Sequence, residues 1–165
     1  MGRSRLHLLI AAVTCLAVPS LADEARRSVW AADPATGCRF ELPRTLAGGN
    51  VFWTGDCPRG RASGLGMLRR RNGSTAGAAF FGELKSGVPT IGVIQMPGGY
   101  EVGRYQDGDL TSTRSRELDF PERLEAFRTA AQAARAVAAK FVVAGHDRSA
   151  AFYANVARQL DEQEE

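Results

Sequence analysis

The spacing of apolar residues changes along the chain and predicts two kinds of secondary structure. From residue 37 to 108, apolar and polar positions alternate in short runs between glycines, as in strands joined by tight turns. From residue 121 to 163, apolar residues recur at steps of three and four, as in amphipathic helices. The polar stretches 23–36 and 109–120 are predicted to be a flexible leader and a linker. We therefore expect an α+β protein, an antiparallel β-hairpin sheet followed by one or two C-terminal helices.

The helical region has recognisable ends. Pro121 is favoured at the first position of a helix, and Gly145 fits a C-terminal cap. A second, shorter helix is predicted from about Arg148. Each helix carries one apolar stripe, formed by Leu124, Phe127, Ala131, Ala134, Ala138 and Phe141 in the first and by Phe152, Val156 and Leu160 in the second. Such stripes usually pack on the protein's own core, and the alternative is a seam for a partner helix or a homodimer.

The first 22 residues have the pattern of a cleavable signal peptide. Arg3 and Arg5 precede an apolar run from Leu6 to Val18, and Ser20-Leu21-Ala22 supplies the small residues that signal peptidase reads. The run has 13 residues, too few to cross roughly 30 Å of hydrocarbon as a helix. We expect cleavage after Ala22 and a periplasmic or secreted protein, the alternative being an uncleaved membrane anchor.

Removal of the signal peptide changes the charge and the cysteine count. The chain has 21 Lys and Arg against 18 Asp and Glu, and the loss of Arg3 and Arg5 leaves 19 against 18. A net charge of +1 gives no general attraction to nucleic acid. Cys38 and Cys57 remain, and an even pair in an oxidising compartment indicates a disulfide worth about 3 kcal/mol. Two buried thiols or a metal pair are the alternatives.

Glycines recur at fixed spacing in the hairpin region. Three units begin with a glycine that is followed five residues later by another: Gly55, Gly82 and Gly103. In the first two units the later glycines also keep step, since Gly73 lies seven residues after Gly66 and Gly99 seven after Gly92. Glycine permits φ > 0 at turns and lets aromatic rings lie against bare backbone. Stacked hairpins then bury one continuous apolar surface.

This register resembles the MORN repeat (membrane occupation and recognition nexus). The first unit matches through Trp53, Gly55, Gly60, Gly64, Gly66 and Gly73, and the second through Phe80, Gly82, Leu84, Gly87, Gly92 and Pro97-Gly98-Gly99. Thr90 stands where the second unit should have a glycine, and the third unit fades after Gly108. The resemblance covers under half of the chain and specifies a fold more than a function.

The segment from Gly37 to Asp56 also resembles the N-terminal cap of small secreted bacterial MORN proteins. That resemblance implies a disulfide between Cys38 and Cys57, which joins a capping strand to the first hairpin. MORN repeats are associated with scaffolding, dimerisation and phospholipid binding. We therefore expect a non-catalytic protein-interaction module in the bacterial envelope. We expect it to bind its partner through an exposed face of aromatic residues and glycines. The residues expected to make the main contacts there are Trp53, Phe80 and Tyr105.

The sequence carries no recognisable catalytic motif. It has no Gly-x-Ser-x-Gly elbow, and the glycines from residue 60 to 66 are not followed by Gly-Lys-Ser/Thr. His146 is the only histidine outside the signal peptide, so a Cys/His metal site lacks ligands. We expect no enzyme activity, metal or other cofactor. The one catalytic alternative is a hydrolase with a carboxylate pair drawn from Asp56, Glu83, Glu101 and Asp107.

Arginines form the one local concentration of charge. Arg69, Arg70 and Arg71 are consecutive, with Arg59 and Arg61 nearby. Such a patch suits anionic phospholipid or glycan, which is the alternative function. It equally fits a solvated hairpin tip whose alternate arginines lie on the two faces of a strand.

Overall fold

The computed structural model describes residues 28–111 and 119–164. The predicted signal peptide, with its cleavage site after Ala22, lies outside the described residues, as does most of the predicted linker. The strands are β1 (Trp30–Ala32), β2 (Arg39–Glu41), β3 (Asn50–Asp56), β4 (Ser63–Asn72), β5 (Thr75–Lys85), β6 (Val88–Met96), β7 (Gly99–Gln106) and β8 (Asp109–Leu110). The helices are α2 (Phe120–Val143) and α3 (Asp147–Asp161), with short 3-10 turns η1 (Arg44–Leu46), η2 (Pro58–Gly60) and η4 (Glu162–Glu164). The expected α+β class, an antiparallel hairpin sheet followed by two helices, is confirmed.

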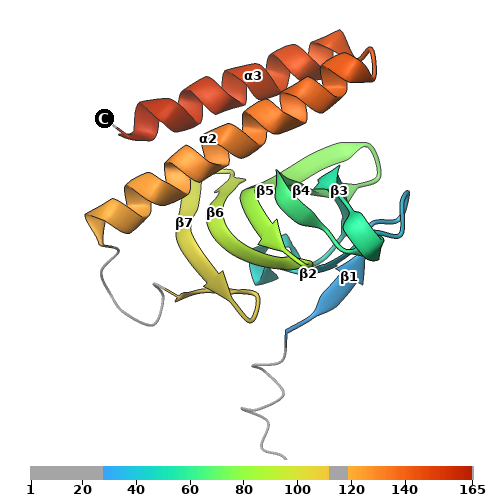
Figure 1. Cartoon of the computed structure of the whole chain (residues 1–165), viewed down its shortest axis with the longest axis horizontal. Helices are drawn as coiled ribbons and strands as arrows, with labels where there is room; N and C mark the ends of the chain where they lie inside the picture. Colours follow the sequence, from blue (N-terminus) through green and yellow to red (C-terminus); the bar gives the residue numbers. More distant parts are fainter. Residues whose placement is uncertain (1–27, 112–118, 165) are drawn as a thin grey trace, which may run out of the picture.

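Strands β3 to β8 form one antiparallel sheet in which each strand pairs with the next along the chain (Figure 1). Met67 lies opposite Phe81, Phe81 opposite Val93, and Val93 opposite Val102, so one register runs through four strands. Sequential hairpins follow from the period-two alternation and the glycine-rich turns. The predicted linker begins too early, because Leu110 pairs with Tyr105 and extends the sheet by one short strand.

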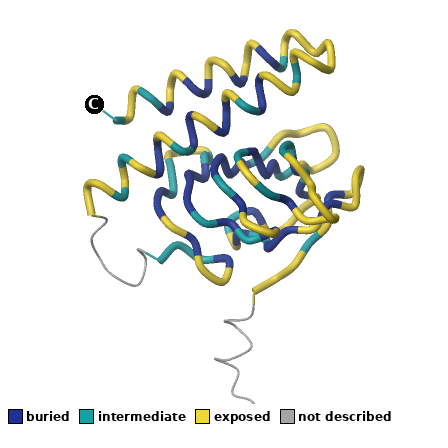
Figure 2. The backbone as a smooth tube through the Cα atoms, in the orientation of Figure 1, coloured by how far each residue is buried: buried dark blue, intermediate teal, exposed yellow. Residues whose placement is uncertain are grey.

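The sheet is apolar on both faces, and both faces are covered. The row of Met67, Phe81, Val93 and Val102 belongs to the core that α2 and α3 complete. Phe80 lies next to Phe81 in β5 but belongs to a second core on the other side of the sheet. Alternate residues of a strand point to opposite faces, so both rings are fully buried. Burial of each ring contributes roughly 1.5–3 kcal/mol to stability. Figure 2 shows buried residues along the middle strands and on the two helices.

Glycines form a further row across the sheet, in which neighbours pair between adjacent strands: Gly66, Gly82, Gly92 and Gly103. The ring of Trp53 lies against Gly66, and the ring of Phe80 lies against Gly82 and Gly92. A Cβ at any of these three glycines would overlap a ring and the neighbouring strand. The predicted role of these glycines, bare backbone against which aromatic rings lie, is confirmed.

The N-terminal segment is a correction to the predicted leader. Residues 30–32 form β1, which pairs with β2 on the side of the sheet away from the helices (Figure 1). Asp33 is buried, and its carboxylate accepts hydrogen bonds from the amides of Ala35 (2.7 Å), Thr36 (3.1 Å) and Trp53 (2.8 Å). A strand of three residues is too short to show a period in the sequence. It exists because β2 pairs with it as a short hairpin, and the Asp33 carboxylate fixes that hairpin to the amide of Trp53 in β3.

Helices α2 and α3 lie side by side over one face of the sheet (Figure 1). The predicted stripe of α2 is confirmed at Phe127, Ala131, Ala134 and Ala138, which are all buried. Further alanines of α2 are buried as well, because the helix packs against both the sheet and α3. The apolar stripe of α2 therefore packs against the protein's own sheet and α3.

The predicted stripe of α3 is partly wrong. Val156 and Leu160 are buried, but Phe152 is exposed and Tyr153 takes the buried position. The ring of Tyr153 stacks on that of Phe141 with centroids 5.3 Å apart. The orientation of α3 is thus as predicted at Val156 and Leu160, and only the first position of the stripe differs, where the Tyr153 ring is buried against Phe141 in place of Phe152.

Candidate functional site

Residues 38–44, which we call the clasp, run across the end of the sheet where three hairpin turns lie. The amide of Ala62, at the end of the β3–β4 connection, donates to the carbonyl of Arg39 (3.0 Å). The amide of Glu41 donates to the carbonyl of Gly87 in the β5–β6 turn (2.7 Å). The amide of Arg44 donates to the carbonyl of Gly108 in the β7–β8 turn (3.1 Å). One short segment therefore holds three hairpins together at the same end.

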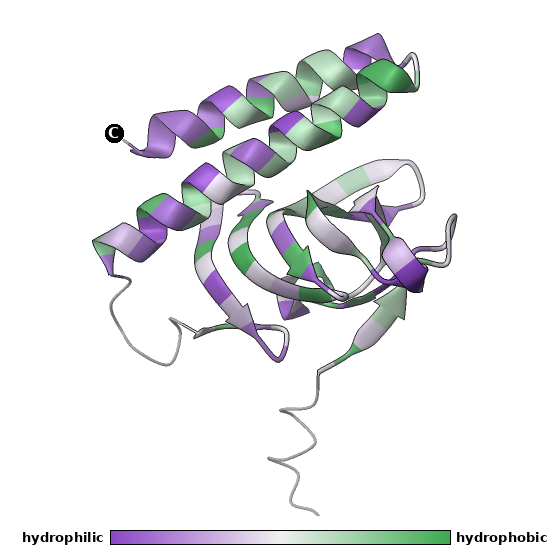
Figure 3. Ribbon diagram, in the orientation of Figure 1, coloured by the Kyte–Doolittle hydropathy of each residue, from purple (hydrophilic) through white to green (hydrophobic). Residues whose placement is uncertain are grey.

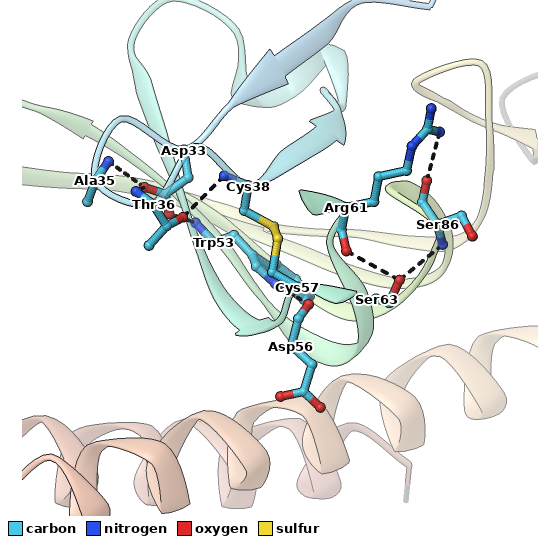
Figure 4. Close-up of a disulfide and its surroundings, with 10 residues drawn as sticks. All are labelled: Asp33, Ala35, Thr36, Cys38, Trp53, Asp56, Cys57, Arg61, Ser63 and Ser86. Atoms are coloured by element: carbon cyan, nitrogen blue, oxygen red, sulfur yellow. Dashed lines mark hydrogen bonds between the residues drawn. A yellow bond between two sulfur atoms is a disulfide. The ribbon is translucent and has the colours of Figure 1, made fainter. Parts of the chain in front are cut away.

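A disulfide links the clasp covalently to the sheet. Cys38 and Cys57 are bonded with an S–S distance of 2.04 Å and a Cα–Cα distance of 6.1 Å (Figure 4). Cys57 lies in the β3–β4 connection, directly after β3. The pairing predicted from the resemblance is confirmed, together with the expectation that it joins an N-terminal strand to the first hairpin.

A basic pocket lies beside this disulfide. It encloses about 380 Å³ and is lined by Pro58, Arg59, Arg61, Ser63 and Ser86. Arg59 (φ 54°) and Ser86 (φ 51°) both have left-handed backbone conformations, which side-chain-bearing residues rarely adopt. Strained residues of this kind persist where the surrounding structure holds them, and here the disulfide and the clasp hold both turns.

Hydrogen bonds connect the two turns that form the basic pocket (Figure 4). The Ser63 hydroxyl accepts from the Ser86 amide (3.2 Å) and lies 3.5 Å from the Arg61 carbonyl. The Arg61 guanidinium donates to the Ser86 carbonyl (3.4 Å) and lies over the ring of Trp30, 5.1 Å from its centroid. Within the described ranges, no carboxylate pairs with Arg59 or Arg61. The sequence shows these arginines, but Trp30 and Ser86 join them only through the fold.

The three aromatic anchors predicted from the sequence do not form an exposed face. Trp53, Phe80 and Tyr105 are at most 7% exposed and belong to the core beneath the clasp. The prediction overlooked that β1, β2 and η1 cover this face. Burial raises the pKa of Tyr105, and the nearby carboxylate of Glu101 acts in the same direction. Its hydroxyl therefore stays protonated and, within the described part of the chain, has no hydrogen-bond partner.

The three consecutive arginines do not form one patch. Arg69 is buried at 9% exposure, where it donates to the Gly77 carbonyl (3.1 Å) and lies over the rings of Phe81 and Tyr153. Arg70 donates instead to the carbonyl of Ala47 (3.0 Å). Arg71 is the only one of the three that is exposed. Alternation along β4 places Arg70 on the other face from Arg69 and Arg71, as the second interpretation of this run predicted, but the burial of Arg69 differs from the solvated hairpin tip that it assumed.

Three of the four candidate carboxylates have other partners. Asp56 pairs with Lys140 (2.8 Å) and Glu83 with Lys85 (3.5 Å), while Glu101 accepts from the Thr45 hydroxyl (2.6 Å). Asp107 lies in the β7–β8 turn with φ 53°. No group of three or more His, Cys, Asp or Glu side chains in the described part of the chain is arranged to hold a metal ion.

A second exposed feature lies at the α2–α3 end of the molecule, where large apolar side chains face solvent. Val142 and Val143 end α2 and are 61% and 90% exposed, and Phe152 of α3 is 54% exposed. Figure 3 shows the apolar end of α2 next to the turn into α3. Phe152 contacts Tyr153, and Tyr153 stacks on Phe141, which precedes Val142. We call Val142, Val143 and Phe152 the helical tip.

Comparison with known proteins leaves the chain without an assigned family. No family model matches it, and no curated protein or solved structure matches it significantly. In the described ranges, no helix combines the length and apolarity needed to span a membrane. The resemblance to MORN repeats therefore remains a prediction.

Proposed function

We propose that this chain is an exported, non-catalytic binding protein of the bacterial envelope that contacts another protein through its helical tip. The observation that carries the proposal is the exposure of Val142, Val143 and Phe152 at one end of a helical pair. Apolar side chains gathered on a surface typically mark a site of interaction. Both faces of the sheet are covered, and of the large apolar side chains exposed in the described ranges, Val142, Val143 and Phe152 all come from the α2–α3 pair near its turn.

Export is supported by the disulfide and by the predicted signal peptide. Disulfides persist in oxidising compartments and are rare in the cytosol. Intact-mass measurement on protein recovered from the periplasm or medium should give a chain that begins at Asp23 and contains one disulfide. A chain that retains residues 1–22 would contradict cleavage after Ala22.

The interaction is tested by site-specific photo-crosslinking. A photoreactive residue at Val143 should give a discrete adduct in envelope extract, and Phe152→Ser in the same chain should weaken it. The matched control is the same probe at Val29, which is 57% exposed but lies at the other end of the chain. An adduct of twice the chain mass identifies a homodimer through the C-terminal helices. The partner would then be a second copy of this chain and not a different protein. No adduct at Val143, or equal adducts at both positions, contradicts the proposal.

The MORN interpretation is part of this proposal. The paired row of glycines under aromatic rings supports it, because this is the arrangement that the repeat register predicts. The alternative function, binding of anionic phospholipid or glycan through Arg69, Arg70 and Arg71, finds less support. Arg69 is buried and Arg70 is half-buried with its guanidinium bonded to a backbone carbonyl, so only Arg71 is fully exposed.

A further inference from the structure

The basic pocket offers a ligand many hydrogen-bond donors and positive charge. Its lining side chains are the guanidinium groups of Arg59 and Arg61 and the hydroxyl groups of Ser63 and Ser86. A guanidinium has five N–H donors and no acceptor, and it keeps its charge at any physiological pH. The pocket lining contains no carboxylate. Its chemistry therefore favours an anion that accepts several hydrogen bonds at once.

The surroundings of the pocket reinforce its positive charge. Arg39 lies beside Arg61, since the two residues form a backbone bridge between the clasp and the β3–β4 connection. Lys85 precedes Ser86 but is paired with Glu83 (3.5 Å), so this pair leaves the local charge unchanged. Asp56, the nearest acid in sequence to Arg59, is paired with Lys140. The local charge is thus positive although the chain without its signal peptide carries only +1.

The pocket is also held in position before any ligand arrives. Arg61 is fixed between the ring of Trp30 and the carbonyl of Ser86. The Ser86 amide donates a hydrogen bond to the Ser63 hydroxyl. The amide of the next residue, Gly87, donates to the carbonyl of Ala62 (2.7 Å). The disulfide and the clasp limit movement between the two turns. Groups that are already ordered lose less entropy on binding, so a small ligand can be bound by few contacts.

We propose that the basic pocket binds a phosphate or sulfate group. Such a group carries several acceptor oxygens around one centre, which suits a pocket lined by two arginines and two serines from two neighbouring turns. A volume of about 380 Å³ accommodates the group together with part of the molecule that carries it. This ligand site is separate from the helical tip, so its test is independent of the proposed protein contact.

The test uses inorganic phosphate as the probe and NMR amide shifts as the readout. Wild-type protein should show saturable shifts at Arg59, Arg61, Ser63 and Ser86, and sulfate should compete. Arg59→Asn should weaken the apparent affinity by about tenfold or more, the effect of losing a charge-assisted contact. Asparagine tolerates the left-handed conformation of residue 59, and the Arg59 side chain makes no ion pair in the described ranges, so the variant should fold.

The matched control is Arg71→Asn, which removes the same charge from an exposed residue at the far end of β4. It should leave the phosphate affinity within about twofold of wild type, because exposed charges further apart than roughly 10 Å are screened. Shifts that do not saturate, or that weaken equally in both variants, overturn the proposal.

A second experiment, sedimentation with lipid vesicles, distinguishes a lipid headgroup from a soluble molecule as the source of the bound phosphate or sulfate group. Sedimentation with phosphatidylglycerol vesicles that is lost in Arg59→Asn and competed by phosphate supports a lipid headgroup as the source. Saturable phosphate binding without sedimentation supports a soluble phosphate or sulfate ester. Sedimentation that Arg59→Asn leaves unchanged, in protein without saturable phosphate shifts, overturns the site.

Discussion

The amide of Glu41 donates a hydrogen bond to the carbonyl of Gly87, 2.7 Å away, and so joins the clasp to the β5–β6 turn. Gly87 is buried at this junction. A Cβ there would lie 2.7 Å from the ring of Trp30 and 3.1 Å from the carbonyl of Arg39. Both the φ of +94° and the close approach of the clasp therefore require glycine at this position.

Gly87→Ala should destabilise the protein more than Gly98→Ala. Gly98 has nearly the same φ (+95°), but a Cβ added there would have no neighbour within 4 Å, so it is a matched control for backbone strain. Both variants should lose about 1–2 kcal/mol from the left-handed conformation. Gly87→Ala should lose a further 1–3 kcal/mol, roughly, from overpacking against the clasp. Urea denaturation measures both, and equal losses would show that the clasp contact contributes little.

Removal of the disulfide should loosen the clasp. The bond closes a loop with a sequence separation of 19, and in the chain-entropy model such a cross-link contributes about 3 kcal/mol. The double variant Cys38→Ser with Cys57→Ser should therefore unfold at lower urea concentration than wild type. Alkylation followed by intact-mass measurement should modify neither cysteine of the wild type until reductant is added. A double variant as stable as wild type would contradict a structural role.

Replacing an alanine of α2 with leucine should destabilise the protein on the buried side of the helix but not on its exposed side. Ala134 is fully buried in the core shared by the sheet, α2 and α3, whereas Ala139 is exposed. Ala134→Leu should cost about 1–3 kcal/mol, because the helix must move away from its neighbours. Ala139→Leu makes the same substitution at an exposed position of the same helix, and it should change stability by less than about 0.5 kcal/mol. Thermal unfolding of both variants measures the difference, and similar melting temperatures would argue against close packing of α2.

Glu41 should make the stability depend on pH. Burial, and to a lesser extent the carboxylate of Asp107, raise the pKa of Glu41 above its usual value of 4.5. The folded state then holds this proton more tightly than the unfolded state. The stabilisation is fully present below pH 4.5 and is lost as the pH rises through the folded pKa.

Glu41→Gln should therefore stabilise the protein at neutral pH, by about 1 kcal/mol, since a buried charge is removed. The gain over wild type should shrink as the pH falls toward 4.5. Urea denaturation across this range measures the effect, and Glu162→Gln on the exposed end of the chain is the control. A variant less stable than wild type at neutral pH would contradict the assigned cause.

Much of the site could not be predicted from the sequence. Arg69, Arg70 and Arg71 looked like a surface patch because they are consecutive, yet strand alternation places them in different surroundings. Trp53, Phe80 and Tyr105 were expected at the surface, because nothing in a local pattern shows that a second hairpin covers the face they share. The arginines that do gather are Arg59 and Arg61, which a turn brings beside Ser86.

What the sequence determined by itself was local. Period-two alternation and glycine spacing were enough to predict the hairpins of the sheet, a 3.6-residue period was enough for α2, and the two remaining cysteines were enough for the disulfide. The clasp, the choice of Tyr153 over Phe152 and the basic pocket were decided only by tertiary structure. Each depends on contacts between residues far apart in the chain. Such contacts produce no periodic pattern in the sequence from which they could be predicted.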